Sequence, residues 1–549
     1  MQIERNNMKP EDLGAYYESI LEKEARKEGG IYYTPQYIVD YIVANTVGKL
    51  VENKLPVDVS RLKIVDPACG GGSFLIGAYQ YLLNWHKDFY TENSKPGKGN
   101  KNNPLTPTGE LTTAEKKRIL VNNIFGVDLD ANAVEVTKLS LLLKCMEGET
   151  EGSIATQLRL FHDRVLPPLE ENILCGNSLI DLDYYDSELN FGEERKIKPF
   201  SWQKAFPDVF KQGGFDCVMG NPPYLGGREW KEENGNAYDY FINKYKVAEY
   251  QFDIYVLFWE AGIQLLKSNG VIGLITPNTW LNNKSNKKLR QYIIGNTRIS
   301  KIVDYSKIKV FSQATVLPII TILENKTDKE GLTEIFEPVE NGYIMTQSVN
   351  QEIWNDDDLS IVNINLSQKD LVLRDKIEKN SEPLEKSALI KFGIKLYEVG
   401  KGTPKQKATD AEKHIFEANR KINKTYRRYL EGKDIHPYRI DYKNRWLKYG
   451  ENLAAPRKPL LFEGERILVR RITGDTLIST YTDSDYVTSS LLHIVKPFEQ
   501  ADTKFLLGII NSKLLAFYFK KKYNRQDKTF PEIRIYELAA LPPYAVKYF

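Results

Sequence analysis

The apolar and polar residues between about positions 60 and 325 alternate in a way that predicts strands and helices in turn. Four short apolar runs have the length and composition of buried strands: Leu62–Val65, Ile124–Val127, Ile173–Cys175 and Phe215–Met219. Helical spacing follows two of them, at about 73–85 and 131–146, and a helix at about 252–267 precedes a strand at Gly270–Ile275. Another buried strand is predicted at Thr315–Leu323. Strands that alternate with helices predict an α/β domain on a parallel, doubly wound sheet over residues 30–325.

The segments on either side of this domain have different patterns. Residues 11–28 have helical spacing and end at Gly29-Gly30, and Thr34-Pro35 is a typical start of another helix. Residues 326–385 are rich in Asp, Glu, Asn and Ser. We therefore expect a helical segment at 1–30, the sheet domain at 31–325, a connector at 326–385 and a mixed α/β domain at 386–549.

Composition and charge add two constraints. The 549 residues are 27% charged and 42% hydrophobic, and the apolar runs are too short to span a bilayer. Four cysteines without CxxC pairing and five scattered histidines indicate a reducing, cytoplasmic setting and no metal site. The net charge is +3, yet residues 381–549 contain 32 Lys and Arg against 20 Asp and Glu. This basic region suggests a bound polyanion, although a solvated basic surface explains the charge equally well.

The chemistry of the chain is concentrated first in the sequence Gly220-Asn-Pro-Pro-Tyr224, directly after a predicted strand. A strand in an α/β sheet delivers such a loop to its carboxyl end, where these folds place their ligands. Two prolines fix φ and remove two backbone donors, so carbonyl oxygens and the Asn221 amide remain to bind one small donor. An amino group on an aromatic ring is the expected guest. By itself the motif is also compatible with a surface turn.

Three further strands end in residues that suit a nucleoside cofactor. Asp66 opens a glycine-rich loop that continues through Gly70 and Gly72, but its spacing is not the GxGxxG of dinucleotide sites. An acid at that position repels a pyrophosphate and suits a cationic amino-acid tail. Asp128 follows the second strand, where an acid binds ribose hydroxyls, and Asn177 follows the third, where it can face an adenine edge. In this order the three residues predict S-adenosylmethionine as cofactor.

Several motifs carry a resemblance to a known family. Tyr33-Thr34-Pro35, DPACGGGSF, GVDLD, CGNSL and GNPPY occur in the order seen in gamma-class N6-adenine DNA methyltransferases, including the methylase parts of type IIG restriction–modification enzymes. The resemblance implies a Rossmann-like S-adenosylmethionine-dependent fold. It also implies a set of cofactor-binding residues: Thr34, Asp66, Ala68, Cys69, Gly70, Gly72, Asp128, Asn177 and Ser178. Gly71 stands where many relatives have another small residue, a difference that we expect to have no effect.

The same resemblance and the chemistry of the motif assign the catalytic residues Asn221, Pro222, Pro223 and Tyr224. The Asn221 side-chain oxygen and the Pro222 carbonyl would accept the two hydrogens of an adenine amino group, and Tyr224 would stack on the flipped base. Relatives place a second aromatic residue against that base. Leu323 or Phe311 falls at the corresponding position here, which leaves this partner open.

The C-terminal region resembles the target-recognition part of the same family more weakly, through GTP at 402–404, YLEGKDI at 429–435 and GIINS at 508–512. We expect double-stranded DNA as partner and phosphate contacts from three basic clusters, with Tyr426, Tyr429 and Tyr518 nearby. These clusters are Arg427-Arg428, Arg470-Arg471 and Lys520-Lys521-Lys522. A separate restriction or specificity subunit is a further possible partner.

Other interpretations remain to be separated. Protein glutamine methyltransferases also use an NPPY loop but have no need of a basic C-terminal region, and enzymes that methylate the amine of cytosine more often carry Ser in place of Asn221.

Pro207-Asp208 followed by Glu229-Trp230-Lys231 formally resembles a nuclease pattern, which we interpret as coincidence because it brackets the GNPPY loop. Because the cofactor motifs begin some 30 residues into the chain, we expect no N-terminal nuclease domain. A catalytically silent DNA-binding module is disfavoured because each cofactor position holds a competent residue.

Overall fold

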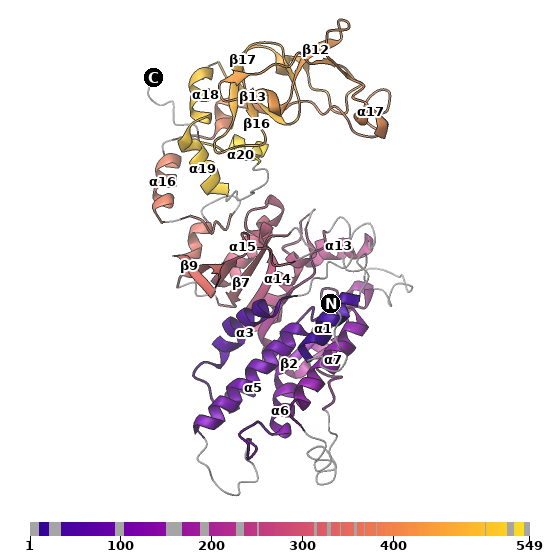
Figure 1. Cartoon of the computed structure of the whole chain (residues 1–549), viewed down its shortest axis with the longest axis vertical. Helices are drawn as coiled ribbons and strands as arrows, with labels where there is room; N and C mark the ends of the chain where they lie inside the picture. Colours follow the sequence, from indigo (N-terminus) through magenta and orange to yellow (C-terminus); the bar gives the residue numbers. More distant parts are fainter. Residues whose placement is uncertain are drawn as a thin grey trace. The chain divides into compact units, whose positions relative to one another are not determined.

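The computed structural model divides into two units, residues 1–362 and 363–549, and each is described by itself (Figure 1). The described residues are 10–20, 34–93, 104–149, 167–186, 197–226, 235–249, 252–311, 316–326, 331–340, 342–355, 360–366, 368–379, 381–499, 501–523 and 532–542. Within these ranges, none of the helices has the length and apolar composition needed to cross a membrane.

A large mixed sheet forms the framework of the first unit. Its strand order is β3-β2-β1-β4-β5-β7-β6-β8-β9. The strands are β1 (Ile64–Asp66), β2 (Ile124–Asp128), β3 (Ile173–Cys175), β4 (Phe215–Gly220), β5 (Leu266–Pro277), β6 (Arg298–Asp304), β7 (Pro318–Glu324), β8 (Thr333–Val339) and β9 (Gly342–Val349). The first five in spatial order run parallel, whereas β7 is antiparallel to both β5 and β6.

This topology confirms the α/β class and corrects the expectation of a wholly parallel sheet. Residues 305–317 join β6 to β7, and the described part of this connection, 305–311 and 316–317, contains no helix, as is usual between antiparallel neighbours. The sheet also continues through β8 and β9, which lie within the segment expected as a connector. Most β9 side chains are exposed, so this edge strand lacks the apolar run by which the inner strands were predicted.

Two helices cover opposite faces of the sheet at its centre. α3 (Gln36–Val51) and α14 (Ile254–Leu265) both pack on β4 and β5. Gly273 of β5 lies against Thr46 and Ile42 of α3, whereas its neighbour Ile272 lies against Gly262 of α14. Successive residues of a strand point to opposite faces, so the two helices sandwich these strands.

The remaining helices of this unit surround the sheet (Figure 1). They are α1 (Pro10–Ile20), α4 (Pro56–Val59), α5 (Ser73–Asn93), α6 (Thr113–Asn123), α7 (Ala131–Met146), α10 (Trp202–Ala205), α11 (Pro207–Lys211), α13 (Gly235–Lys244) and α15 (Lys287–Asn296). Of the helix expected over residues 11–28, the structure describes α1, and residues 21–28 lie outside the described ranges.

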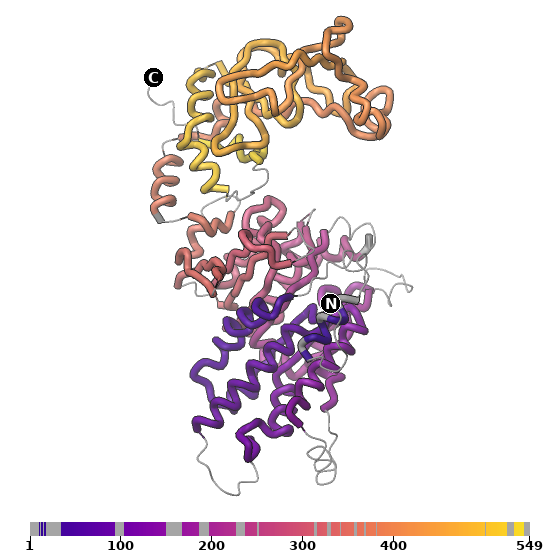
Figure 2. The backbone as a smooth tube through the Cα atoms, viewed as in Figure 1, coloured from indigo at the N-terminus to yellow at the C-terminus, as the bar shows by residue number. Residues whose placement is uncertain are grey.

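The second unit is built from small antiparallel-rich sheets and short helices, whose chain path is shown in Figure 2. One sheet has the order β10-β19-β16-β17, with β10 (Ala388–Phe392), β16 (Arg466–Arg470), β17 (Ser479–Thr482) and β19 (Leu492–Pro497). The other has the order β11-β15-β12-β18, with β11 (Glu417–Ala418), β12 (Tyr426–Leu430), β15 (Trp446–Lys448) and β18 (Val487–Thr488). β13 (Ile435–His436) pairs with β14 (Arg439–Ile440), and the helices are α16 (Gln368–Lys379), α17 (Ala408–Glu412), α18 (Thr503–Ile510), α19 (Lys513–Tyr523) and α20 (Ile535–Ala539).

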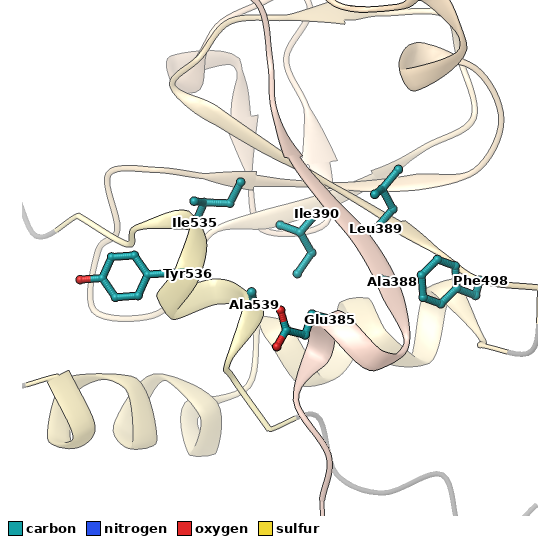
Figure 3. A pocket seen from close by; sticks show the side chains of 8 residues that line it. All are labelled: Glu385, Ala388, Leu389, Ile390, Phe498, Ile535, Tyr536 and Ala539. Carbon is teal, nitrogen blue, oxygen red and sulfur yellow. The ribbon is translucent and has the colours of Figure 1, made fainter. Parts of the chain in front are cut away.

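A shared apolar core joins the two sheets of this unit. Leu430 and Leu447 of one sheet pack in the same cluster as Leu468 and Ile494 of the other. A shallow cavity of about 300 Å³ lies between β10 and α20 (Figure 3). Its lining is Glu385, Ala388, Leu389, Ile390, Phe498, Ile535, Tyr536 and Ala539.

Helix α1 is packed directly on the loop that follows β1. A Cβ added to Gly14 would lie 2.6 Å from the Gly71 carbonyl oxygen, and one added to Gly71 would lie 2.5 Å from the Gly14 Cα. The Tyr17 hydroxyl donates a hydrogen bond to Asp130, the residue that caps α7. Gly71 therefore has a packing role that its place in the motif did not reveal.

We expect Gly14→Ala to detach α1 from the loop, because the new methyl group meets backbone rather than a movable side chain. Overpacking of this kind costs about 1–3 kcal/mol. Hydrogen exchange measured by mass spectrometry should show faster exchange of the α1 amides in this variant. Gly295→Ala is the matched control, since Gly295 also lies in a helix but has open space around its Cβ position. Equal α1 protection in the two variants would contradict the packing described here.

Candidate active site

The strand order brings the predicted site residues to one edge of the sheet. β3, β2, β1 and β4 are parallel neighbours, and Asp66, Asp128, Asn177 and Asn221 lie at or just beyond their carboxyl ends. The pairs Asp66↔Gly126 and Asp128↔Cys175 are in register, so successive strands end at similar heights. Residues separated by up to 155 positions in the chain are thus collected at the place where α/β folds bind ligands.

Backbone hydrogen bonds hold the loop after β1 around its two acids. Asp66 Oδ1 accepts from the Ala68 amide at 2.9 Å, and Asp128 Oδ2 accepts from the Gly70 amide at 2.8 Å. The Cys69 amide donates to the Val127 carbonyl at 3.1 Å. The loop after the first strand is thereby joined to the end of the second.

Gly70 and Gly72 adopt positive φ angles of 50° and 86°, a conformation that favours glycine. The Thr137 hydroxyl of α7 donates to the Gly70 carbonyl at 2.7 Å, and a Cβ at Gly72 would lie 2.9 Å from the Thr137 side chain. Thr137 is therefore a positioning residue of this loop. Sequence reasoning missed it, because a threonine inside a helix carries no motif signal.

The two acids have an unusual electrostatic setting. Burial raises the pKa of Asp66 to about 8, with a further increase from the charge of Asp128 that is opposed by the Ala68 amide. Burial also raises the pKa of Asp128, although the Asp130 and Gly70 amides favour its ionised form. Two carboxyl groups that resist simultaneous ionisation form a site that a cation would stabilise.

Asn177 and Ser178 turn the chain after β3. The Asn177 side-chain oxygen accepts from the Leu179 amide at 3.1 Å, and the Ser178 hydroxyl donates to the Pro67 carbonyl at 2.5 Å. Ser178 is buried, and its carbonyl accepts from the indole of Trp202. The loops after β1 and β3 are therefore joined directly, which places Ser178 beside Pro67, the residue that follows Asp66.

The NPPY loop is held by its own side chains. The Asn221 amide nitrogen donates to the Thr34 hydroxyl at 3.1 Å, and the Tyr224 hydroxyl lies 2.5 Å from the Asn221 side-chain oxygen. The same hydroxyl lies 3.0 Å from the Ile275 carbonyl of β5. Thr34, predicted on the cofactor side, is thus in direct contact with the predicted catalytic amide, and Pro222 and Pro223 join the two bonded residues.

Aromatic rings surround Tyr224. Its ring is 8% exposed and makes edge contacts with Tyr255 and Phe311, each with centroids 6.2 Å apart. Of the two candidates for a second aromatic position, Phe311 lies beside Tyr224. Leu323 is buried within β7, where it pairs with Ile272 of β5.

Asp253 anchors the chain directly after the motif. It caps α14, and its side-chain oxygen accepts from the Leu225 amide at 3.0 Å. The Ile254 amide donates to the Leu225 carbonyl at 2.9 Å. The loop is thus fixed at both ends. An aspartate directly before a helical pattern indicates a helix cap, so the sequence signals this role of Asp253. Nothing in the sequence signals that Asp253 also holds the loop at Leu225.

The basic residues predicted to contact DNA are distributed over separate elements of the second unit. Arg428 of β12 pairs with Asp485, Arg471 with Glu532, Lys521 with Asp370 and Lys522 with Glu378, whereas Lys520 lies 3.9 Å from Asp475. Arg427 lies over the Tyr449 ring, and Arg470 lies at the end of β16 near Gly432. Most of these cations already have an acidic partner.

Two of the neighbouring tyrosines are not available at the surface. Tyr429 and Tyr518 are each 2% exposed, so they belong to the interior, whereas Tyr426 is partly exposed. The tyrosines are buried because side chains of a strand or a helix alternate between a buried and an exposed face, and each of these two tyrosines lies on the buried face of an element that also carries basic residues. DNA contact by the clusters themselves stays a prediction.

Two expectations from the sequence remain, one about the nuclease-like pattern around the GNPPY loop and one about metal sites. Asp208 is exposed at the start of α11 and pairs with Lys211 at 2.9 Å, while Glu229–Lys231 lie outside the described residues. Among the residues that the structure describes, no three His, Cys, Asp or Glu side chains are grouped as metal ligands would be.

Family models match most of the chain. Residues 8–164 match the N-6 DNA methylase family, residues 122–311 the Eco57I restriction-modification methylase family, and residues 427–542 the TaqI-like C-terminal specificity domain. The first two span every strand-end residue described above.

Two relatives extend this likeness. The type II restriction enzyme and methyltransferase RM.Eco57I of Escherichia coli is 32% identical over 60% of this chain and 32% of its own length. The putative enzyme of the same description, RM.MjaORFECS2P of Methanocaldococcus jannaschii, is 24% identical over 98% of this chain and 56% of its own length. The chain therefore spans about a third to a half of these relatives.

Solved structures support the fold. The type IIL restriction–modification enzyme MmeI, solved in complex with DNA, has a TM-score of 0.62 at 14% identity and covers 97% of this chain and 71% of its own. A nuclease-deletion mutant of the type ISP enzyme LlaGI has a TM-score of 0.52 at 14% identity, over 92% and 45% of the two chains. The chain thus contains regions similar to the N-6 DNA methylase and Eco57I restriction-modification methylase families and a region similar to the TaqI-like specificity domain, and the relatives that it matches include type II restriction enzymes and methyltransferases.

Proposed function

We propose that the chain is a site-specific DNA methyltransferase that moves a methyl group from S-adenosylmethionine to the exocyclic amine of a flipped adenine. The observation that carries the proposal is the position of the Asn221 amide, which lies one strand from the buried acid Asp66 and contacts Thr34. A candidate site for the amine that accepts the methyl group and a candidate site for its cationic donor are therefore adjacent. The matches to adenine methylase families support the same chemistry.

The residues present fit the cofactor. Asp66 and Asp128 resist ionisation together, and the amino-acid tail and sulfonium of S-adenosylmethionine carry positive charge that would stabilise both carboxylates. Asp128 uses one lone pair of each oxygen for a backbone amide and keeps others for ribose hydroxyls. Asn177 and Ser178 would lie on the adenine side, and Thr34, Ala68 and Cys69 on the methionine side. The bound cofactor would supply a methyl group on a cationic leaving group.

The chain's own task is then to position the amine. The Asn221 side-chain oxygen and the Pro222 carbonyl would accept its two hydrogens and direct the nitrogen lone pair toward the methyl group. Tyr224 now lies within hydrogen-bond distance of Asn221, and it has a second acceptor in the Ile275 carbonyl. A shift of the hydroxyl hydrogen to Ile275 would release the Asn221 oxygen for substrate. The extra proton leaves the methylated amine for water.

Base flipping costs a few kcal/mol, of which stacking on an aromatic ring recovers about 1–3 kcal/mol. Tyr224 is the proposed stacking residue, and Phe311 is the neighbouring ring that fits the second position. Because Tyr224 is buried against other rings in this structure, a base would enter by displacing one of these contacts.

A second candidate is the methylase part of a bifunctional restriction enzyme, favoured by the names of the longer relatives RM.Eco57I and RM.MjaORFECS2P. Protein glutamine methylation is less well supported, because residues 427–542 match a specificity domain of DNA-modifying enzymes. Tritiated methyl transfer to DNA or protein, with a magnesium-dependent nicking assay, separates these activities.

We expect Asn221→Ala to lower methyl transfer to DNA at least a hundredfold, because the acceptor of the amine hydrogens is removed. Calorimetry should show that cofactor affinity changes less than threefold, and single-turnover kinetics should place the loss in the chemical step. Asn296→Ala is the control, since Asn296 is exposed at the end of α15 and bonds only within its helix among the described contacts. Full activity of Asn221→Ala would refute the mechanism.

The raised pKa of Asp66 predicts a pH-dependent cofactor affinity. Below about pH 8 the ligand-free carboxyl holds a proton, whereas a cationic ligand favours the carboxylate, so binding releases that proton. Affinity should rise between about pH 6 and 8, by up to about tenfold per pH unit, and then level off. Stability of the ligand-free protein should change in the opposite sense, because burial of the charge penalises folding progressively from about pH 4 to about pH 8.

Calorimetry in two buffers of different ionisation enthalpy measures this proton directly. We expect release of up to one proton at pH 6.5 with S-adenosylmethionine and less with S-adenosylhomocysteine, which lacks the sulfonium charge. Asp66→Asn should remove the pH dependence and weaken binding. Proton uptake, or a release that Asp66→Asn leaves unchanged, would show that another group is responsible.

A further inference from the structure

A short loop in the second unit carries three cationic side chains that, unlike most of the predicted basic clusters, have no acidic partner among the described residues. Residues 419–425, here called the basic loop, connect β11 to β12 and include Arg420, Lys421 and Lys424. All seven residues are exposed. Among the described residues, no ion pair joins these three side chains to a carboxylate, in contrast to Arg428, Arg471, Lys521 and Lys522. Their charge is therefore available to an external anion.

The basic loop has defined anchors at both ends. The Asn423 side-chain oxygen accepts from the Thr425 amide and hydroxyl at 2.9 and 2.6 Å, and the Tyr449 amide donates to the Thr425 carbonyl at 2.9 Å. At the other end, the Asn444 side chain donates to the Asn419 carbonyl at 3.2 Å. The cations are thus presented from a held backbone, which lowers the entropy cost of binding.

An aromatic and polar strip continues from the basic loop. Lys421 lies over the ring of Trp446, which is partly exposed, with its ammonium nitrogen 5.8 Å from the ring centre. Directly opposite residues on antiparallel strands point to the same face, so the pairs Tyr426↔Lys448 and Arg428↔Trp446 share one face of β12 and β15. Leu447 points to the other face and into the core. Cations and aromatic rings are therefore adjacent on one surface.

An apolar side chain stands among these charges. Ile422, between Lys421 and Asn423, is 59% exposed. A duplex groove offers partners for such a mixture of side chains, with phosphates at its edges and base edges or thymine methyl groups within. No acidic residue occurs in residues 419–428, so the whole segment has one sign of charge.

We propose that the basic loop enters a groove of duplex DNA, with Arg420, Lys421 and Lys424 on phosphates and Ile422 on base edges. The inference rests on the proposed function, because it names the DNA-contacting segment of that same enzyme. It assigns affinity to the three cations and sequence discrimination to the isoleucine. The predicted cation Arg427 is paired with Leu447, so it points to the opposite face of these strands, where it lies over Tyr449.

The test compares two triple variants of the full chain on a duplex that contains the motif methylated by the wild type. In R420A/K421A/K424A we expect affinity at 0.1 M NaCl to fall at least tenfold. The slope of log affinity against log salt should decrease in magnitude by about 2.7, because each phosphate that is no longer neutralised lowers it by about 0.9. K391A/K504A/K513A removes the same charge from exposed lysines of β10, α18 and α19, and it should keep the wild-type slope.

A second comparison isolates the isoleucine. Ile422→Ala should keep the salt slope and lower the preference for the target duplex over random duplex about tenfold, whereas Leu460→Ala, at a side chain that is 69% exposed, should not. Cofactor affinity and thermal unfolding should be unchanged in all variants, because each altered side chain is exposed. A basic-loop variant with the wild-type slope, or with the same loss of affinity as the control, would overturn the inference. Absence of DNA methylation by the wild type would instead refute the proposed function.

Discussion

The site depends on two carboxyl groups that the fold buries within reach of each other. Asp66 and Asp128 end neighbouring strands, and each is held by amides of the loops that follow. Burial raises the pKa of both carboxyl groups, to about 8 for Asp66, and so penalises their charged forms. A ligand with positive charge would offset that penalty, which is why the proposed occupant of the site is a cationic nucleoside rather than a pyrophosphate.

The rest of the first unit holds this pair in place and adds the acceptor side. Asn221 reaches the same edge because β4 is the next strand of the sheet, and Thr34 connects it to the start of the α3 segment. Thr137 and the Gly14–Gly71 contact fix the loop after β1, and Asp253 fixes the chain that follows the NPPY motif. Catalysis of this type needs little acid–base chemistry, so precise positions matter more than reactive side chains.

The second unit divides its cations by electrostatic environment. Lys521 and Lys522 join α19 to α16 through Asp370 and Glu378, which makes them part of the internal structure of the unit. The cations of the basic loop have no such acidic partner among the described residues. Charge counts along a sequence do not separate these two groups, because the neutralising acids are about 150 residues away.

The sequence by itself determined where the inner strands lie along the chain and which polar residues follow them. Buried parallel strands are continuous apolar runs whose carboxyl ends share one edge of the sheet, so the gathering of Asp66, Asp128, Asn177 and Asn221 at that edge was predictable. Tertiary structure decided what depends on distant partners. The antiparallel strand β7 makes the sheet mixed, and the exposed edge strand β9 extends it. Phe311 rather than Leu323 contacts Tyr224. Most of the predicted DNA-binding cations are paired with acidic side chains. These outcomes arise from contacts between segments far apart in the chain, and local composition carries no record of which segments will meet.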